Sequence, residues 1–596
     1  MKYLSIILLL SCLGFSVQKS TPQDDHYVGA VVEYTVTGNV ATNLLNYANL
    51  IKTAADQGAD IVVFPELTLT NGSTTFEVPI YGNLRDHPVP ALSPALYDEF
   101  MVTISNAARQ NDIYVVINGR ELLDCTVQQA VGEYCPEAKQ YIFNTNVVFD
   151  RTGKVINRFR KINLFGEFAH TPALNPDLGV FDTDFGVTFG HFICFDLMFQ
   201  VPAVQVVQKS KVKNVIFPTM WFSELPYLTA VQIQEAYAYS LDVNFLGAGA
   251  NNVRVGSAGS GIYSGKAGAL ISIMPGLPTT KVLVAKVPKV PGQVTEPYPG
   301  PIYDDPANHD NLKLIVDPSL PSHVSRLLEL GSQEFTLVDK DVSCTFRVTL
   351  AQREGNTHYR YRAGVFSGVR SYSGVATGGV RICGIYACTD ENRRTCGDRL
   401  PTYVANTTGI FEELVITATL PTPVLVSSLD TDDSIVYPVS SKVTVMPLES
   451  KDFTYTKVQQ SDVTVHTMTL TNKMAELYTF AIWGRRFATD GQEADPPLPD
   501  ELGDVTPEPA TPTTPAPETT LGPETTPGPE TTLVPETTPG PETTPGPETT
   551  SGPETTPGPE TTTLDTEPTP APGASTVHLL SKFLFATLVA FVCFSV

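Results

Sequence analysis

Three side chains with complementary chemistry lie in or just after strand-like runs in the first third of the chain. Glu66 ends the run 61–66, Lys161 follows the run 155–160, and Cys194 lies within the apolar run 190–199. A carboxylate can take a proton, an ammonium can stabilise a developing oxyanion, and a thiolate can attack a carbonyl carbon. Together these are the parts of a thiol amidase.

Each of the three has an ordinary alternative when it is taken singly. A lone buried cysteine such as Cys194 usually packs in a core, and a glutamate after a strand is usually a solvated loop residue. Lys161 lies close to Arg158 and Arg160, so it could belong to a solvated basic face. The order of the three residues, each at the end of a strand, favours the catalytic interpretation.

The elements that must position these residues alternate between strand and helix. Apolar residues at helical spacing predict a helix over 41–56, which Gly58 would cap. The remaining expected elements are strands at 27–34, 61–64, 113–118, 186–195 and 214–218, a hairpin at 146–156, and helices at 96–110 and 201–210. This alternation predicts an α/β domain with buried sheets.

Several short motifs carry a resemblance to a known family. They are AADQGAD at 54–60, PE at 65–66, KINLFGE at 161–167, CFD at 194–196, FPTMWFSELP at 217–226 and GSGIY at 259–263. This pattern resembles the nitrilase (carbon–nitrogen hydrolase) superfamily and, within it, the vanin/biotinidase family. The resemblance implies a four-layer αββα sandwich over residues 21–295.

The resemblance also implies roles for the site residues. Glu66 would be the general base and Cys194 the nucleophile that forms a thioester. Lys161 would hold positive charge near the oxyanion, beside the backbone N–H of Phe195, and would ease the ionisation of the thiol. Glu167 could orient Lys161.

Three further side chains lie in or beside the same motifs. Trp221 would line the pocket or pack beneath it, and Asp196 is expected to be structural rather than catalytic. His191 has no assigned role, and neither has His170.

The implied reaction is hydrolysis of a linear amide that needs no metal or other cofactor. In this family the implied substrate is pantetheine, which is cleaved to pantothenate and cysteamine. For the biotinidase-like members of the family, the implied substrate is biotinyl-lysine amide. A non-catalytic surface-binding or adhesion protein on the same scaffold is the alternative from a different functional class. The sequence does not indicate an oligomeric state.

After a Pro-rich linker, residues 310–488 are expected to form a second, smaller β-rich domain. The expected strands lie at 335–338, 345–350, 359–361, 413–418, 442–446, 463–470 and 478–483. Period-two alternation, as in the run 463–468, is typical of half-buried antiparallel strands. Residues 489–572 are expected to be a disordered Pro/Thr/Glu stalk, because Pro-Glu-Thr-Thr recurs every six residues from 517 to 559.

Both ends of the chain have the composition of processing signals. Lys2 followed by a mostly apolar stretch predicts a signal peptide over residues 1–20, with an N-terminal anchor as the alternative. The small residues Gly573, Ala574 and Ser575, a spacer and the apolar tail 583–596 predict a GPI-anchor signal over residues 573–596. A plain tail anchor is the alternative. With these signals, the two folded domains would be anchored by lipid on the extracellular face of the plasma membrane or shed from it.

Of the nine cysteines, seven remain after the predicted removal of both ends. An odd number in a secreted protein indicates one free thiol, and Cys194 is the natural candidate. Cys125 and Cys135 are expected to pair. The other four would form two disulfide bridges of open connectivity: Cys344, Cys383, Cys388 and Cys396. A zinc site formed by the last three of these is the less favoured alternative. Asn71 and Asn406 begin glycosylation sequons.

The net charge of −24 is unevenly spread along the chain. Seventeen of the acidic residues and no Lys or Arg lie in residues 490–567, which leaves −7 for the rest. Nucleic-acid binding needs a basic footprint, so the composition argues against such a partner.

Overall fold

A computed structural model describes residues 19–70, 72–126, 135–173, 175, 177–352, 358–404 and 406–506. The first domain contains two sheets that are joined where the end of one strand, β1, pairs with β10 through Tyr34 and Ala250. The first sheet has the order β13-β1-β2-β3-β4-β5. Its strands are β1 (His26–Thr35), β2 (Ile61–Val63), β3 (Tyr114–Asp124), β4 (Gln140–Phe149), β5 (Val155–Arg160) and β13 (Lys281–Pro288).

The second sheet faces the first and has the order β6-β7-β8-β10-β11-β12-β14. Its strands are β6 (Val180–Asp182), β7 (Thr188–His191), β8 (Asn214–Thr219), β10 (Asn244–Asn251), β11 (Ser260–Ser264), β12 (Ala269–Ile273) and β14 (Gly300–Ile302). β14 lies in the expected Pro-rich linker and pairs in parallel with β12. The chain therefore adds a strand to the first domain before it enters the second.

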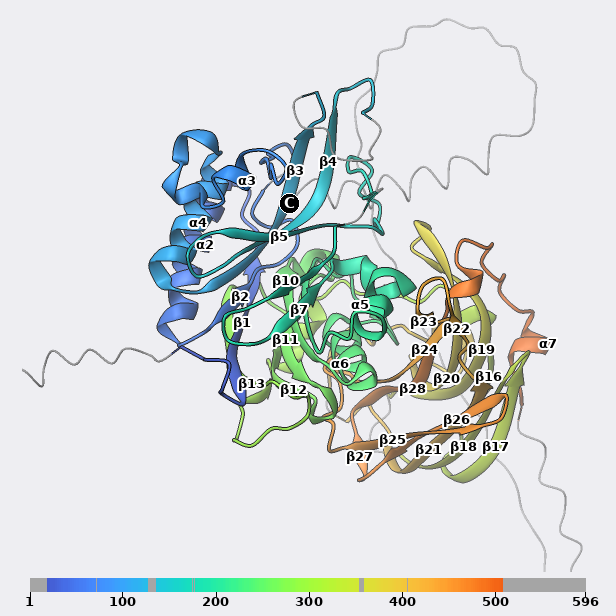
Figure 1. Ribbon diagram of the computed structural model, residues 1–596. Coiled ribbons are helices and arrows are strands. Elements are labelled where there is room, and N and C mark those ends of the chain that lie inside the picture. The colour runs from blue at the N-terminus through green and yellow to red at the C-terminus, as the bar shows by residue number, and fades with distance from the viewer. Residues whose placement is uncertain are drawn as a thin grey trace, which may run out of the picture. The chain divides into compact units, whose positions relative to one another are not determined.

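Helices cover the outer faces of both sheets. α2 (Val40–Asp56) and α4 (Glu99–Asn111) lie against the first sheet, and α5 (Gln205–Gln208) and α6 (Ala230–Leu241) lie on the side of the second (Figure 1). Alternate residues of β1 serve two cores: Val32 packs with α2 and α4, while Val31 packs between the sheets. This period-two alternation confirms the expected αββα sandwich.

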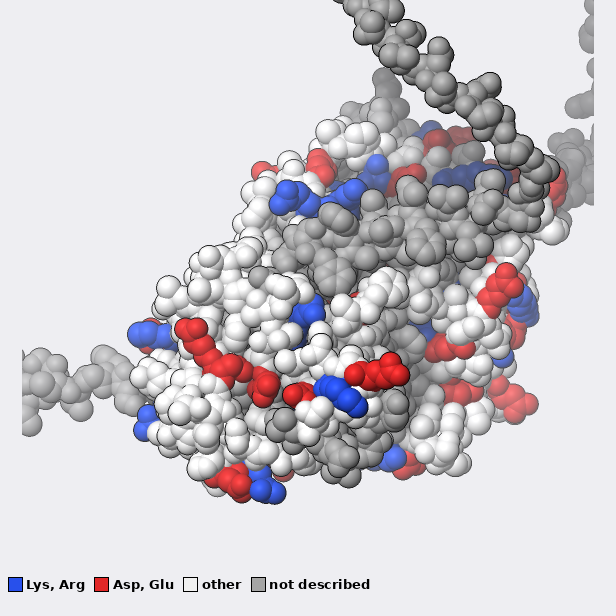
Figure 2. Space-filling model, turned by 90° about the horizontal axis from the view of Figure 1, so that it is seen from above, with Lys and Arg blue, Asp and Glu red and all other residues white. Residues whose placement is uncertain are grey.

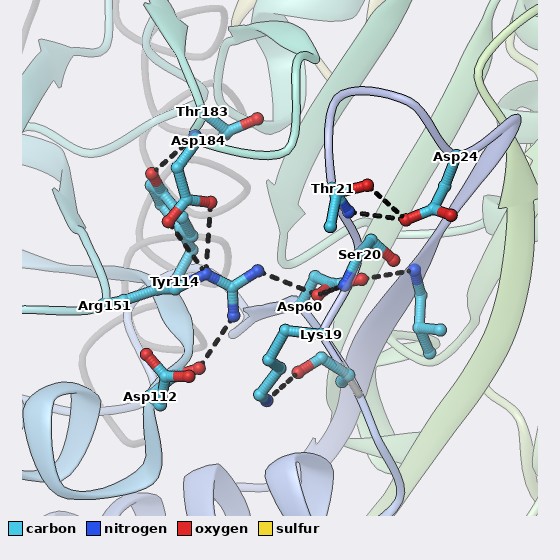
Figure 3. A network of polar contacts seen from close by, with 12 residues as sticks. Lys19, Ser20, Thr21, Asp24, Asp60, Asp112, Tyr114, Arg151, Thr183 and Asp184 are labelled. Atoms are coloured by element: carbon cyan, nitrogen blue, oxygen red, sulfur yellow. Dashed lines mark hydrogen bonds and ion pairs between the residues drawn. The ribbon is translucent and has the colours of Figure 1, made fainter. Parts of the chain in front are cut away.

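The segment that precedes β1 is held beside the start of β2 by a polar network. Arg151 donates from Nη2 to Asp60 Oδ1 at 2.8 Å, from Nε to Asp184 at 3.1 Å and from Nη1 to the carbonyl of Asp112 at 2.8 Å (Figure 3). Asp60 Oδ1 also accepts the backbone N–H of Ser20 at 3.0 Å. Because Asp60 immediately precedes β2, this network fixes the strand that carries the chain to Glu66.

The second domain is a sandwich of two antiparallel sheets. One has the order β16-β19-β20-β28-β24 and the other β17-β18-β21-β26-β25, with β27 on β21. The first contains β16 (Val324–Leu327), β19 (Arg360–Tyr372), β20 (Ala376–Cys388), β24 (Ser434–Lys442) and β28 (Leu477–Arg486). The second contains β17 (Gly331–Asp339), β18 (Val342–Ala351), β21 (Ile410–Pro421), β25 (Phe453–Gln460), β26 (Val463–Leu470) and β27 (Met474–Ala475). Smaller elements are α3 (Asn83–Asp86), β9 (Glu224–Leu225), β15 (Ile315–Val316), β22 (Leu425–Val426) and β23 (Thr431–Asp432).

Most of the expected strands of this domain are present, but the expected strand at 442–446 is wrong. β24 ends at Lys442, and Val445 lies in a turn with φ of +55°. Three long strands, β20, β24 and β25, were not expected from the sequence. β20 contains two adjacent glycines, which weaken the strand pattern that the other segments show.

The folded region extends past the expected stalk boundary at residue 489. α7 (Asp500–Gly503) follows the second domain, and Arg393 Nε lies 3.1 Å from Asp500 Oδ1. The backbone N–H of Val505 donates to the carbonyl of Ser325 at 2.8 Å. The first acidic residues of the expected stalk therefore serve as ion-pair partners of the second domain.

Several predicted features lie outside the described residues: the segments 1–18 and 507–596, with the repeats and Gly573, Ala574 and Ser575, and the sequon residue Asn71. Asn406 is described and exposed. Within the described ranges, no helix is long and apolar enough to cross a membrane. On the face seen in Figure 2, acidic and basic side chains lie close together in small groups among uncharged ones.

Candidate active site

Glu66 enters the interior just beyond β2 and is 2% exposed. The next residue, Leu67, has a left-handed backbone with φ of +50°, and its N–H donates to Asn118 Oδ1 at 2.8 Å. Asn118 lies on the neighbouring strand β3, so a side chain of the sheet holds this turn. The turn directs the Glu66 carboxylate toward the ends of β5 and β8.

Lys161 follows the last residue of β5 and lies between two carboxylates. Its Nζ donates to Glu66 Oε1 at 2.7 Å and to Glu167 Oε1 at 2.8 Å. The neighbouring Arg158 and Arg160 are buried on Glu121, at 2.9 and 2.6 Å. The solvated basic face considered from the sequence is therefore wrong, and Lys161 lies where the catalytic interpretation requires.

Asn144 is a site residue that sequence reasoning missed. Its Nδ2 donates to Glu66 Oε1 and to Glu167 Oε1, both at 2.7 Å, and its Oδ1 accepts from Asn118 Nδ2 at 2.8 Å. A buried polar group needs such partners. The available signal was a run of polar residues, Asn144 to Asn146, between the apolar ends of β4, which sequence reasoning did not use.

Cys194 lies in a turn and not in the strand expected over 186–195. β7 ends at His191, and the 3-10 turn Cys194–Met198 begins at the cysteine, whose φ is +47°. A non-glycine residue in this conformation costs of order 1–3 kcal/mol and is concentrated at functional sites. The first N–H groups of a helical turn have no acceptor within it, so the Phe195 N–H begins the turn as a donor beside the thiol.

The helix expected over 201–210 is also only partly correct. Val201 is extended, with φ of −112° and ψ of 122°, and a short π-helical turn over Gln200–Val204 leads into α5. The regular helix is therefore limited to Gln205–Gln208.

One residue, Met220, links Cys194 to Glu66 through its backbone. Cys194 Sγ donates to the carbonyl of Met220 at 3.7 Å, and the Met220 N–H donates to Glu66 Oε2 at 2.8 Å. Met220 follows the last residue of β8. The ends of β2, β5, β7 and β8 therefore converge, and the two sheets together bring Glu66, Lys161 and Cys194 into one buried cluster.

Burial and charge set the protonation of this cluster. Burial raises the pKa of Glu66, and Lys161 only partly offsets this. Burial opposes the charge of Lys161, but Glu167 and Glu66 outweigh it and raise the pKa of Lys161 well above its usual value. Burial and the charge of Glu66 likewise raise the pKa of the Cys194 thiol, although Lys161 lowers it as expected. The raised pKa values keep the Cys194 thiol neutral and Lys161 charged at rest.

A narrow pocket of about 40 Å³, partly open to solvent, leads to Cys194. Trp221 lines it, as anticipated, and its Nε1 donates to the carbonyl of Leu228 at 2.8 Å. Most of the wall is aromatic or aliphatic. The complete lining is Phe165, Cys194, Phe195, Met198, Trp221, Phe222, Glu224, Leu228, Tyr372 and Ser373. The last two residues belong to the second domain.

Asp196 binds the chain on both sides of the site. It accepts the backbone N–H and side-chain amide of Asn163 at 2.8 and 2.9 Å and the N–H of Ile193 at 3.2 Å. Burial raises the pKa of Asp196 to about 7. These contacts tie the loop after Lys161 to the turn that holds Cys194, which is a structural role.

The two histidines near the site are neutral. Burial lowers the pKa of His191 to about 3 and that of His170 to about 4. His191 Nε2 lies 2.8 Å from Asn157 Oδ1.

The cysteines divide as the sequence predicts. Cys125 pairs with Cys135, and the open connectivity of the second domain resolves into Cys344–Cys383 and Cys388–Cys396. Cys194 is the free cysteine of the described region. Within that same region, no group of His, Cys, Asp and Glu side chains has the arrangement of a metal site.

Comparison with known proteins gives a family match for each of the two domains. The carbon-nitrogen hydrolase family matches residues 28–289, and the vanin C-terminal domain matches residues 313–490. Together with the αββα fold, these matches define a carbon–nitrogen hydrolase of the nitrilase superfamily that acts on amides.

Individual relatives show to which family of this superfamily the chain belongs. Vanin-like protein 1 of Drosophila melanogaster is 33% identical over 518 residues, which cover 81% of this chain and 90% of that protein. Pantetheinase of Mus musculus is 30% identical over 366 residues, 59% of this chain and 69% of that protein. Biotinidase of Homo sapiens is 29% identical over 442 residues, 65% of this chain and 79% of that protein. The chain belongs to the vanin family.

Proposed function

We propose that the protein hydrolyses pantetheine to pantothenate and cysteamine through a thioester on Cys194. The observation that carries the proposal is the buried cluster in which Glu66 accepts a hydrogen bond from Lys161 while the backbone N–H and carbonyl of Met220 link Glu66 to Cys194. Similarity to mouse pantetheinase supports the choice of substrate. The mostly apolar wall of the pocket, with a few polar groups, can contact the carbon skeleton of an organic amide.

Acylation begins with proton transfer from Cys194 Sγ to Glu66 as the sulfur attacks the amide carbonyl carbon. Negative charge develops on the carbonyl oxygen, where Lys161 and the Phe195 N–H stabilise it. Collapse of this intermediate breaks the C–N bond, and the proton held by Glu66 leaves with the amine. The acyl group remains on sulfur as a thioester.

Deacylation uses the same groups with water as the nucleophile. Glu66 takes a proton from water, and the oxygen attacks the thioester carbon while Lys161 again faces the oxyanion. The C–S bond breaks, the acid leaves, and the proton returns to Cys194. Glu167 and Asn144 hold the ammonium and the base in place throughout, because both contact the Lys161–Glu66 pair.

We further propose that this head domain acts at the outer cell surface. The predicted signal peptide, the repeat stalk and the GPI-like tail support extracellular anchoring, and the sequons at Asn71 and Asn406 support glycosylation. The stalk would hold the head away from the lipid. Release of the protein from intact cells by a phosphatidylinositol-specific phospholipase tests this, and a protein that stays on the cells after treatment contradicts it.

The test of the reaction is a substrate panel on the full-length protein. We expect release of cysteamine from pantetheine by the wild type, detected as a new primary amine, and no release by Cys194→Ala, with a trapped acyl-enzyme visible by mass spectrometry in the wild type alone. Turnover of biotinyl-lysine amide without turnover of pantetheine would instead indicate a biotinidase-like enzyme. The similarity to human biotinidase is the reason to include this substrate. No turnover of either amide would leave the binding-protein alternative.

A further inference from the structure

We propose that Tyr372 of the second domain is a specificity-determining residue of the amidase pocket. Its hydroxyl group would bind a hydroxyl on the substrate arm, so that the enzyme selects hydroxylated amides over plain aliphatic ones. This inference rests on the proposed amide hydrolysis at Cys194 and deepens it by naming the substrate feature that is recognised.

Tyr372 reaches the pocket from the end of β19, at the turn of the β19–β20 hairpin. It lines the same cavity as Cys194, and its ring packs edge-on against Phe195 with centroids 5.4 Å apart. Phe195 directly follows the nucleophile. The second domain therefore contributes a wall of the site next to the reacting sulfur.

The hydroxyl of Tyr372 is a buried polar group without a partner. The residue is 4% exposed, and its oxygen makes no hydrogen bond among the described residues. Buried hydroxyl groups in folded proteins are normally satisfied, and an exception calls for an explanation. A substrate group that completes this hydrogen bond supplies one.

Two buried arginines fix the ring in place. The Arg370 guanidinium carbon lies 4.5 Å from the ring centroid, and that of Arg485 lies 5.7 Å from it. Arg485 Nε also donates to the carbonyl of Met198 at 2.8 Å, across to the first domain. Such cation–π contacts orient an aromatic ring, so the hydroxyl does not simply rotate into solvent.

Arg370 is in turn held by two carboxylates, one in the first domain and one near the start of the second. Its Nη2 lies 2.5 Å from Glu224 Oε1, and its Nη1 donates to Asp317 Oδ2 at 2.8 Å. Arg370 and Asp317 have fully buried side chains, and that of Glu224 is 8% exposed. Glu224 also lines the pocket. The network therefore places a second polar group in the same cavity as Tyr372.

The combination of these two groups indicates what they bind. A carboxylate accepts hydrogen bonds, whereas a phenol can donate one. A substrate hydroxyl can donate to Glu224 and accept from Tyr372 at the same time, but an alkyl chain can do neither. The surrounding aromatic wall then accommodates the carbon skeleton that carries the hydroxyl.

The test compares pantetheine with an analogue that lacks its two hydroxyl groups but keeps the scissile amide. In Tyr372→Phe we expect kcat/KM for pantetheine to fall by about tenfold, as loss of a hydrogen bond in a specificity pocket does. For the deoxy analogue, kcat/KM should stay within about twofold of the wild type. The matched control is Tyr478→Phe, which removes a buried hydroxyl that donates to the carbonyl of Asp398, and there the ratio of the two substrates should not change.

The outcomes separate this inference from the proposed function. An equal loss on both substrates in Tyr372→Phe, or no loss on either, overturns the role of Tyr372 while the enzyme remains a pantetheinase. If the wild type cleaves neither amide, the proposed function fails and this inference fails with it. Arg370→Lys keeps the charge but alters the contact with the ring, and we expect the same selective loss on pantetheine from that variant.

Discussion

Lys161 Nζ and Glu66 Oε1 lie 2.7 Å apart in the interior, where neither side chain is more than 2% exposed. A buried ion pair is an expensive way to stabilise a fold, because both charges lose their hydration. Here the ammonium also binds Glu167 and stands at the end of the strand that faces the thiol. The arrangement is therefore explained by chemistry that needs a base and a cation at one place.

Removal of Lys161 should both destabilise and inactivate the protein. In Lys161→Met the carboxylates of Glu66 and Glu167 would stay buried without their cation, and breaking such a pair costs about 3–5 kcal/mol. Denaturant unfolding measures the loss, and amide turnover should fall below detection. Lys154→Met, in the exposed hairpin turn, should change stability by no more than about 0.5 kcal/mol. Equal stabilities of the two variants would contradict the buried pair.

Glu66→Gln should move catalysis and thiol reactivity in opposite directions. Loss of the general base should lower kcat by roughly 10²–10⁴-fold. The same change removes a negative charge that raises the pKa of Cys194, so more thiolate should form and alkylation by iodoacetamide at neutral pH should become faster. Stopped assays with mass-spectrometric counting of labelled Cys194 measure both. Slower alkylation together with slower turnover would show that Glu66 does not oppose ionisation of the thiol.

The acid limb of the pH profile should report Glu66. Its pKa is raised, and the general base must be ionised, so kcat/KM should decline as the pH falls through that raised pKa. Glu167 is one of the charges that raise it. Glu167→Gln should therefore shift the acid limb of kcat/KM to lower pH, whatever its effect on the maximal rate. A limb that stays in place would assign it to a group other than Glu66.

The N-terminal ion-pair network offers a test of stability that should spare the chemistry. In Arg151→Met, Asp60 would lose its buried cation, and we expect a loss of about 3 kcal/mol in the free energy of unfolding. The KM for the amide should not change, because no atom of Arg151 lines the pocket. Arg109→Met, on the exposed side of α4, is the matched control. A change in KM without a change in stability would overturn this separation.

The sequence predicted most of the first domain because its signals are local. β2 is a continuous apolar run, and α2 repeats its buried residues at helical spacing, as in Leu44 and Ile51. The turn at Cys194 was missed because an apolar run contains no residue pattern that indicates a left-handed φ at a cysteine. The elements around the site were therefore correct in order but wrong in detail where the backbone is strained.

The contributions from distant segments could not be read from spacing. Asn144 reaches Glu66 from β4, and Tyr372 reaches Phe195 from a second domain, across 78 and 177 residues of sequence respectively. Such pairs depend on how sheets stack, which periodicity does not encode. The pairing of Cys344 with Cys383 was left open for the same reason.

That disulfide yields a final prediction, because it joins the two sheets of the second domain through β18 and β20. Cys344–Cys383 spans 39 residues and Cys388–Cys396 spans 8. If constraint of the unfolded chain dominates, the longer loop should stabilise by about 1.4 kcal/mol more than the shorter one. Unfolding of the two double Cys→Ala variants measures this difference. The expectation is contradicted if loss of the 8-residue loop costs as much, and the local contacts of β20 rather than chain entropy would then govern the stability of the strand that pairs with β19 and its Tyr372.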